Sequence, residues 1–256
     1  ISQVEELLNS IEQEENIVST IVSAIGENKT TYDNVLSTLI VLLDIFKNEI
    51  NWKCLSEKWE KLCKIIREIP YSDKQISARM GDARHIEMED NLVDLMITSP
   101  PYINVFNYHQ KYRRSVEALG YDVLKIAKKE FGSNRKNRGN RLYTVVGYCI
   151  DMALAMQEVS RVCKQDARMI YVVGRESSVL GYSFYNSELI YNIGMEIFGF
   201  RFSLRQQRVF KNRFGQMIYE DILHFENAKT INISEEEIIS KAREIAKRAL
   251  EEKLKF

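Results

Sequence analysis

Apolar residues recur every three or four positions through the first 69 residues of the chain, and this spacing predicts amphipathic helices. One apolar stripe covers residues 4–11, a second covers 36–46 and a third covers 52–63. A polar stretch that begins at Gly26 separates the first two stripes, and Pro70 follows the third. The pattern therefore predicts a helical bundle or cap that ends near residue 70.

The periodicity changes between about residues 75 and 227, where short β-rich runs alternate with longer helical stretches. Alternation of this kind is typical of an α/β sheet. The predicted strands cover residues 76–80, 93–98, 169–173, 200–210 and 217–225, and the predicted helices cover 145–162 and 187–198.

The end of this region and the C-terminus have their own signals. The last two predicted strands are separated by a short polar stretch at residues 211–216, which favours an antiparallel hairpin at the sheet edge. Ser234 and Glu237 form a capping-box pattern that opens a heavily charged helix. We therefore expect three regions: helices at 1–70, an α/β region at 71–230 and a C-terminal helix at 231–256.

Composition narrows the class of protein. With 256 residues and 45% hydrophobic residues, the chain can bury a sizeable core. Its longest apolar runs are too short for a membrane helix, and its first residues do not resemble a signal peptide, so we expect a cytoplasmic protein. The first residue is Ile1 rather than Met, which is compatible with processing, trimming or a fragment. Four cysteines without a close pair and three histidines do not predict a metal site.

Two of the chain's three prolines are adjacent, in the segment Ser99-Pro100-Pro101-Tyr102, directly after the predicted strand 93–98. Ligands of open α/β sheets bind at the carboxyl ends of strands. Fixed proline φ angles can hold the Ser99 and Pro100 carbonyl groups as acceptors at defined positions. A strand-terminating turn without chemistry is the alternative reading.

The segment Thr98-Ser-Pro-Pro-Tyr102 resembles the catalytic motif of the DNA amino-methyltransferases, which transfer a methyl group from S-adenosylmethionine to an exocyclic base nitrogen. Serine in its first position is most similar to the cytosine-N4 branch, whereas aspartate is commoner in adenine-N6 enzymes. The stretch from Gly81-Asp-Ala-Arg84 to Gly174-Arg-Glu176 is also similar, so the resemblance covers about residues 75–227. It implies a partial Rossmann-like methyltransferase sheet with a C-terminal antiparallel hairpin.

The resemblance implies a mechanism and a set of catalytic residues: Ser99, Pro100, Pro101 and Tyr102. Acceptors at Ser99 and the Pro100 carbonyl would bind the two hydrogens of the amine and direct the nitrogen lone pair at the methyl group. Tyr102 would stack on a base that has left the duplex. The cofactor-binding residues that it implies are Asp82, Ala83, Thr98, Ser99 and Pro100. For Asp82, a turn or cap aspartate is an equal alternative.

Charge is distributed unevenly along a chain that has 36 basic and 36 acidic residues. Residues 111–141 carry a local charge of +7, and residues 201–213 hold five basic and no acidic residues. Such segments can neutralise phosphates, although a solvated charge run is the alternative. The predicted DNA contacts are Asn104, Tyr108, Lys111, Arg113, Arg114, Arg135, Lys136, Arg138, Arg141, Arg205 and Arg208.

One part of the family pattern is missing. Complete enzymes of this type carry a glycine-rich Phe-x-Gly-x-Gly segment that approaches the cofactor, whereas the eleven glycines of this chain never occur as Gly-x-Gly. We therefore expect the catalytic half of a split enzyme, which works as a heterodimer with a polypeptide, or with a missing N-terminal half, that supplies the cofactor turn. Restriction-modification is the biological setting that the resemblance implies.

Other functions stay open at this point. Adenine-N6 methylation is the first alternative, and a non-catalytic DNA-recognition or assembly subunit is the second. Methylation of an RNA base or of a protein amide would use the same chemistry, but the basic segment at 111–141 favours nucleic acid.

Overall fold

The computed structural model of the chain describes residues 2–11, 16–27, 30–45, 48–103, 110, 112–131, 139–228 and 233–254. The chain divides into two compact units. The first contains Ile1–Ser77 and Asn107–Ala127, and the second contains Ala78–Phe106 and Lys128–Phe256. The predicted boundaries at residues 70 and 230 stay predictions.

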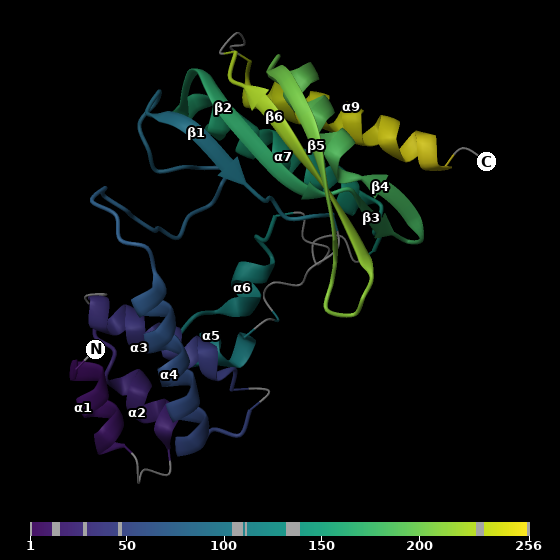
Figure 1. Cartoon of the computed structure of the whole chain (residues 1–256). Coiled ribbons are helices and arrows are strands. Elements are labelled where there is room, and N and C mark those ends of the chain that lie inside the picture. Colours follow the sequence, from purple (N-terminus) through teal and green to yellow (C-terminus); the bar gives the residue numbers. More distant parts are fainter. Residues whose placement is uncertain are drawn as a thin grey trace. The chain divides into compact units, whose positions relative to one another are not determined.

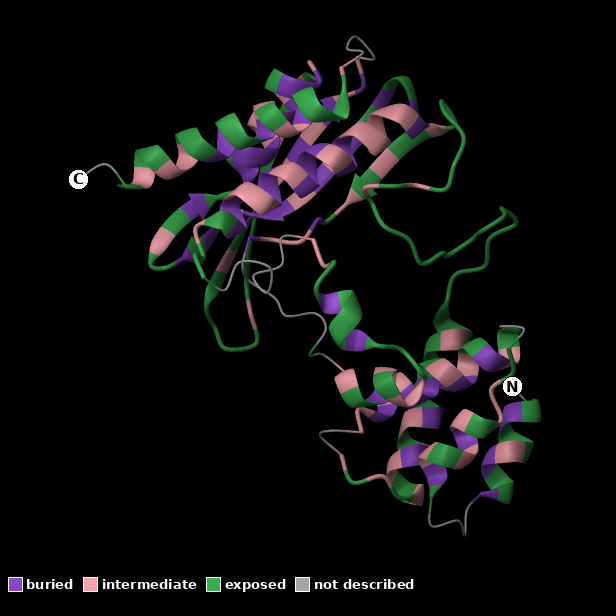
Figure 2. Ribbon diagram, turned by 180° about the vertical axis from the view of Figure 1, so that it is seen from behind, coloured by how far each residue is buried: buried purple, intermediate pink, exposed green. Residues whose placement is uncertain are grey.

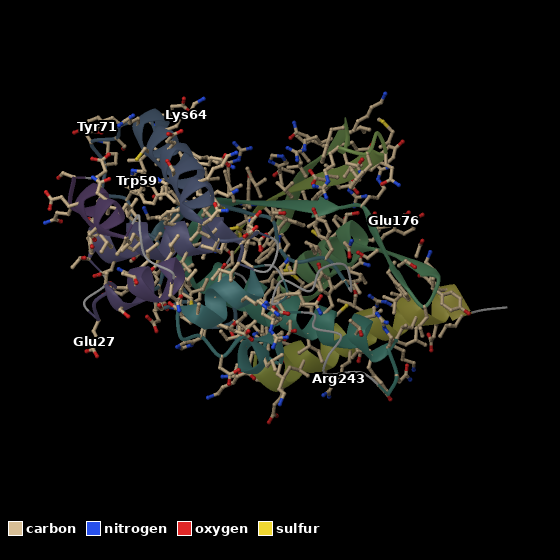
Figure 3. The ribbon with its side chains drawn as sticks, turned by 90° about the horizontal axis from the view of Figure 1, so that it is seen from below. Glu27, Trp59, Lys64, Tyr71, Glu176 and Arg243 are labelled. Carbon is tan, nitrogen blue, oxygen red and sulfur yellow. The ribbon has the colours of Figure 1, made fainter. Side chains whose placement is uncertain are left out.

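The first unit is helical wherever it has regular structure among the described residues. Its helices are α1 (Ser2–Ser10), α2 (Ile17–Ser23), α3 (Thr31–Leu43), α4 (Trp52–Glu68), α5 (Arg113–Ala118) and α6 (Val123–Ala127). Local signals fix their starts: Thr30 and Asp33 form a reciprocal capping box at α3, and Asn51 caps α4. The three predicted apolar stripes face the core of this unit. On α4, Trp59 points inward, whereas Lys64 points outward (Figure 3).

The second unit contains a four-stranded sheet with the order β1-β2-β6-β5. Its strands are β1 (Val93–Thr98), β2 (Cys163–Gly174), β5 (Arg201–Lys211) and β6 (Met217–Glu226). β1 and β2 are parallel, whereas β6 is antiparallel to both β2 and β5. The unit is thus a partial Rossmann-like α/β sheet that ends in an antiparallel hairpin, as the sequence predicts.

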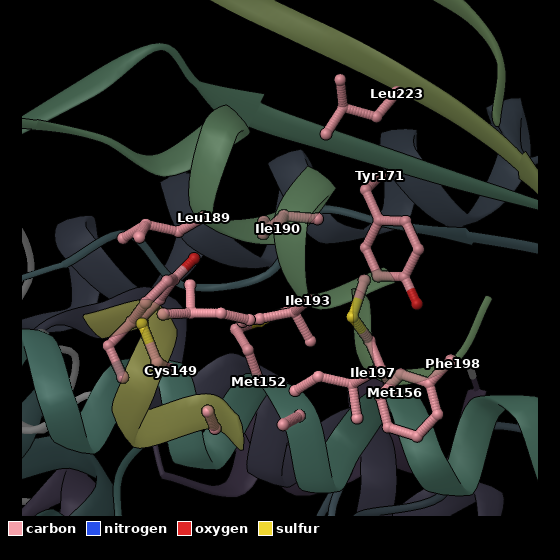
Figure 4. Close-up of a cluster of buried hydrophobic side chains, with 14 of the residues drawn as sticks. Cys149, Met152, Met156, Tyr171, Leu189, Ile190, Ile193, Ile197, Phe198 and Leu223 are labelled. Atoms are coloured by element: carbon pink, nitrogen blue, oxygen red, sulfur yellow. The ribbon is translucent and has the colours of Figure 1, made fainter. Parts of the chain in front are cut away.

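Helices cover one face of this sheet (Figures 1 and 2). They are α7 (Tyr143–Val162), α8 (Asn186–Asn192), the π-helical turn η3 (Ile193–Ile197) and α9 (Glu235–Leu254). Alternate residues of β2, namely Met169, Tyr171 and Val173, point toward the helices and are buried in a core shared with α7 and α8. Figure 4 shows Tyr171 in this core. The predicted helix 145–162 is confirmed, and the prediction 187–198 is divided between α8 and η3.

The C-terminal helix α9 also belongs to this core. Its apolar residues Ile238, Ala242 and Ile245 recur at three- and four-residue spacing and are buried, while most of its charged residues are exposed. The predicted charged helix is confirmed, and one of its faces contributes to the core of the sheet unit.

One predicted strand is wrong. Residues 76–80 form no strand, and Ile76 and Met80 are 79% and 84% exposed. An alternating apolar pattern gives a strand only where another strand can pair with it, and the described residues offer this segment no such partner.

A small hairpin was not predicted. It joins β3 (Glu176–Val179) to β4 (Tyr182–Tyr185). Leu180 and Gly181 in its turn have φ angles of 53° and 86°, a combination that a tight two-residue hairpin requires.

The cysteines differ in exposure, and this predicts their reactivity. Cys63, Cys149 and Cys163 are buried, whereas Cys54 is half-buried. Burial raises the pKa of Cys149 to about 12, so its reactive thiolate is scarce at pH 8. In a titration of the native protein with a chromogenic disulfide reagent, Cys54 should react first and the other three only on unfolding. Four equally fast thiols would contradict this arrangement.

Two kinds of feature are absent from the described residues. No described helix has the length and apolar character that a membrane crossing requires. Within the same residues, no group of three or more His, Cys, Asp or Glu side chains is arranged to hold a metal ion.

Candidate functional site

The Ser-Pro-Pro-Tyr segment lies at the carboxyl end of β1, as predicted. Thr98 is the last residue of the strand and pairs with Tyr171 of β2. Ser99 is then exposed, Pro100 is buried, and Pro101 and Tyr102 are half-buried. The loop therefore presents the Ser99 side chain to solvent at the end of the sheet where α/β proteins bind their ligands.

Tyr102 packs against the end of the neighbouring strand at Gly174. A Cβ atom on Gly174 would lie 2.7 Å from Cε2 of Tyr102, which is closer than side-chain carbons approach one another. The aromatic ring thus occupies the space that a side chain at position 174 would fill. Glycine is required here for close approach, and its φ angle is not the reason.

The phenol of Tyr102 faces an acidic residue on β6. Its hydroxyl lies 3.4 Å from Oε1 of Glu220, and Arg208 donates to the other carboxylate oxygen of Glu220 at 2.8 Å. Burial raises the pKa of Tyr102, the charge of Glu220 raises it further, and a hydrogen bond with Ser99 opposes these effects. Tyr102 therefore stays a neutral phenol at physiological pH.

Asn186, at the start of α8, holds the loop in place through side-chain hydrogen bonds. Its Nδ2 donates to the Gly174 carbonyl and to Oγ of Ser177, both at 2.9 Å. Its Oδ1 accepts from the Ile103 backbone amide at 3.3 Å. Asn186 is fully buried, so these bonds are made without competition from water. One side chain thus connects the end of the Ser99–Tyr102 loop, at Ile103, to the ends of β2 and β3.

Four residues of this site were missed by the sequence analysis in these roles: Gly174, Asn186, Glu220 and Asp221. Glu220 and Asp221 had a detectable signal, because two adjacent carboxylates interrupt a mainly apolar run of the strand. Asp221 is buried and pairs with Arg175 at 3.5 Å, while the Arg175 guanidinium lies over the Tyr219 ring. Asn186 carries no pattern that distinguishes it from a helix-capping asparagine.

Asp82 and Ala83, two of the predicted cofactor contacts, lie in a turn before β1, and Asp82 is held in an ion pair. Arg84 binds both carboxylate oxygens of Asp82, at 2.9 and 2.7 Å, and also binds Asp151 of α7 at 2.6 Å. The hydrogen bond with Arg84 lowers the pKa of Asp82. Asp82 therefore orients Arg84, which attaches the turn to α7. This structural role agrees in part with the alternative prediction that Asp82 is a turn aspartate.

The Arg84–Asp151 pair should stabilise the second unit measurably. Both side chains are largely buried, at 19% and 12% exposed, so Asp151→Asn removes one of the two carboxylates that neutralise Arg84 and leaves only Asp82. We expect the free energy of unfolding to fall by about 2 kcal/mol in urea titrations. In the exposed Lys247–Glu251 pair of the same unit, Glu251→Gln should change it by less than about 0.5 kcal/mol. Equal losses in the two variants would contradict this difference.

The predicted DNA contacts fall into three groups. Asn104, Tyr108, Lys111, Arg135, Lys136 and Arg138 lie outside the described residues. Arg113 and Arg114 belong to α5 in the first unit, where Arg113 pairs with Glu117. The second unit contains Arg141, Arg205 and Arg208, of which Arg205 pairs with Glu188 at 2.5 Å and Arg208 with Glu220. In the second unit, Arg208 lies close to the Ser99–Tyr102 loop, through Glu220.

The chain has limited similarity to known proteins. No family model matches the chain. Among solved structures, the chain is similar to an S-adenosylmethionine-dependent methyltransferase of Methanosarcina mazei, with 11% identity, a TM-score of 0.35, and coverage of 67% of this chain and 77% of that one.

One characterised relative is similar in sequence. The chain is 32% identical over 116 residues to the type II methyltransferase M.BsoBI of Geobacillus stearothermophilus. The match covers 45% of this chain and 20% of M.BsoBI, so the chain spans about a fifth of that protein.

Proposed function

We propose that this chain takes part in S-adenosylmethionine-dependent methylation of an exocyclic amine in DNA, with cytosine-N4 as the preferred target. The observation that carries the proposal is the position of the Thr98–Tyr102 motif. It follows the end of a parallel strand, with Ser99 exposed and Tyr102 held beside Gly174 and Glu220. The similarity to M.BsoBI supports DNA as the substrate.

The residues of the loop suit the amine side of this reaction. In this proposal the Ser99 hydroxyl accepts one amine hydrogen, and the Pro100 carbonyl accepts the other. Pro101 restricts the loop, and the half-buried Tyr102 ring would position a flipped base by stacking. When bound, S-adenosylmethionine would supply an electrophilic methyl group.

The described residues fit only part of that cofactor. Thr98, Ser99 and Pro100 could contact its reacting end, but the carboxylate of Asp82 is bound by Arg84 and no Gly-x-Gly turn exists in the sequence. We therefore propose that a second polypeptide supplies the glycine-rich turn, and that the two chains act together as a heterodimer in a restriction-modification setting.

The β5–β6 hairpin is the DNA-contacting arm in this proposal. β2 ends at the Gly174–Glu220 pair, whereas pairing between β5 and β6 continues to Lys211 and Met217 (Figure 1). Because β6 is antiparallel to β2, the hairpin projects from the same end of the sheet as the Ser99–Tyr102 loop. It carries basic residues and exposed apolar side chains at its tip, among them Phe214, which is 72% exposed. A two-stranded ribbon of this kind fits the major groove of DNA.

Removing two charges from the arm should weaken DNA binding in a salt-dependent way. For the double variant Lys211→Ala/Arg213→Ala we expect the slope of log K against log salt concentration to become shallower by about 2, because two phosphate contacts are lost. Fluorescence anisotropy with a labelled duplex, repeated at several salt concentrations, measures the binding constant K and therefore the slope. The control Lys241→Ala/Lys247→Ala removes two charges from α9 and should leave the slope unchanged. A similar change in both variants would indicate non-specific charge effects.

Methyl transfer itself is tested on the complex purified from native cells through a tag on this chain. Methyl-labelled S-adenosylmethionine and DNA are supplied, and the product nucleosides are separated. N4-methylcytosine is the expected product, and Ser99→Ala, Pro100→Ala and Tyr102→Ala should lower the single-turnover rate more than DNA affinity. Ser183→Ala, in β4, is the matched control. N6-methyladenine would move the target to adenine, and label in RNA or protein would overturn a DNA substrate. Unchanged rates in all three variants would indicate a non-catalytic subunit.

A further inference from the structure

One face of the four-stranded sheet carries several apolar side chains and is uncovered among the described residues. On β1, Leu95 and Ile97 are 51% and 63% exposed, although they belong to a hydrophobic strand. They pair with Arg168 and Ile170 of β2, whose side chains point away from the helices because Met169 and Tyr171 point toward them. We call this surface the bare face; its apolar residues are Leu95, Ile97, Ile170, Val172, Leu204 and Ile222.

Strand pairing makes the bare face continuous across all four strands. Val172 pairs with Ile222, and Ile170 pairs with His224, which in turn pairs with Leu204 of β5. The helices α7, α8 and α9 all lie on the opposite side of the sheet (Figures 1 and 2).

A polar atom on the same face lacks a partner. Nε2 of His224 lies 3.0 Å from Oε1 of Gln206, but its Nδ1 is buried and forms no hydrogen bond with the described residues. Because this nitrogen is already covered by atoms of the chain itself, an incoming element cannot reach it, and the docking surface depends on the apolar side chains.

An uncovered face is unusual for this kind of sheet. Parallel strands occur almost only where both faces of the sheet are covered, and large exposed apolar patches mark interaction surfaces. β1 and β2 are parallel, and β1 is an edge strand in the described sheet. Both the edge of β1 and the bare face beside it are therefore available to a partner.

The position of the Ser99–Tyr102 loop identifies the occupant. In open α/β sheets the ligand crevice forms where strand order reverses, between two strands whose following helices lie on opposite faces. Among the described residues of the sheet unit, the helices α7, α8 and α9 lie on one face, and the loop follows the edge strand β1. A crevice at Ser99 thus requires another parallel strand on the free edge of β1, with its following helix on the bare face.

We propose that the bare face and the edge of β1 form the docking surface for a second polypeptide, which adds a parallel strand beside β1 and a helix over Leu95 and Ile97. The turn between that strand and helix then lies beside Ser99, where a glycine-rich turn can approach the cofactor. This inference rests on the proposed function, since it places the cofactor turn of the second polypeptide next to the methyl acceptor.

The test uses a photoreactive phenylalanine derivative at position 97 of the full chain, expressed in its native cells. Irradiation should link this position to a polypeptide that contains a Gly-x-Gly segment, identified by mass spectrometry of the cross-linked peptides. The matched control is the same derivative at Leu180, which is 59% exposed but lies in the β3–β4 turn. Position 180 should give no such product.

A second measurement separates docking from loss of folding. The identified polypeptide is purified and titrated against the chain by calorimetry, where Leu95→Ser/Ile97→Ser should weaken binding about tenfold or more. Leu180→Ser should bind normally. Far-UV circular dichroism and the hydrogen exchange of α7 show whether the double variant keeps its fold, and single Ile97→Ser or Ile97→Lys variants replace it if it does not.

Other products would overturn the docking proposal. A separate partner on this surface is excluded if position 97 cross-links to a second copy of this chain, to residues 2–68 or to a longer form of the same polypeptide. It is also excluded if labelling at position 97 is no stronger than at position 180. Methylation assays distinguish the two proposals. If the chain methylates DNA without any such partner, docking is wrong and the function stands. If the cross-linked pair binds S-adenosylmethionine but methylates no DNA, docking stands and the function is wrong.

Discussion

Replacing Gly174 with alanine should lower the single-turnover rate of methyl transfer by about 100-fold, because the new methyl group would displace Tyr102. The Cβ atom would lie 2.7 Å from Cε2 of Tyr102, with two more ring atoms at 3.1 Å, so the ring has to shift by about 1 Å to restore an ordinary contact. A displacement of this size in a group that positions substrate costs about two orders of magnitude in rate. Rapid quench with methyl-labelled cofactor and the purified complex measures it.

A double-mutant cycle makes this prediction specific to the pair. Tyr102→Ala removes the ring, so adding Gly174→Ala to it should lower the rate little further. The control Gly26→Ala, in the first unit, introduces a Cβ atom 3.5 Å from Asp33, an ordinary contact, and should leave the rate unchanged. Independent, multiplying effects of Gly174→Ala and Tyr102→Ala would show that the glycine acts by another route.

Asn186→Ala should be the most destabilising polar substitution in the second unit, lowering its free energy of unfolding by about 3 kcal/mol. It leaves the Ile103 amide, the Gly174 carbonyl and the Ser177 hydroxyl without their buried partner. Asn186→Asp should be at least as harmful, since a carboxylate oxygen would then face the Gly174 carbonyl.

Both tryptophans, Trp52 and Trp59, lie in the first unit, so tryptophan fluorescence would not report on the unfolding of the second unit. Hydrogen exchange of the β2 amides under native conditions reports on the second unit directly. Asn192→Ala, at the other end of α8, is the matched control and should change stability by less than about 0.5 kcal/mol. If β2 exchanges at the wild-type rate in Asn186→Ala, the three hydrogen bonds do not stabilise the loop.

The sequence predicted those parts of the fold that depend on local periodicity. β1, α7, β2 and the β5–β6 hairpin each have a clear pattern, and proline chemistry placed the Ser99–Tyr102 loop at the end of β1. The predicted strand at residues 76–80 failed because alternation describes a segment's preference and says nothing about a pairing partner.

The parts of the site that escaped prediction depend on contacts between distant residues. Asn186 binds the amide of Ile103, and Tyr102 fills the space above Gly174, but neither contact follows from the local sequence. For Glu220 and Asp221, ion pairing could have been predicted, because buried carboxylates in a strand require cationic partners. Here the partners are Arg208 and Arg175.

The parallel pairing of β1 with β2 also affects the order in which the site forms. Thr98 and Tyr171 are joined by a long crossover through α7, whereas β5 and β6 are consecutive strands of one hairpin. Pairings of high sequence separation have a large loop-closure entropy and form slowly, so we expect the hairpin to be established before β1 joins the sheet. The Ser99–Tyr102 loop, which we propose as the methylation site, would then be fixed by one of the last pairings to form during folding. Until β1 joins the sheet, the edge of β2 stays unpaired and can pair with a strand from another chain.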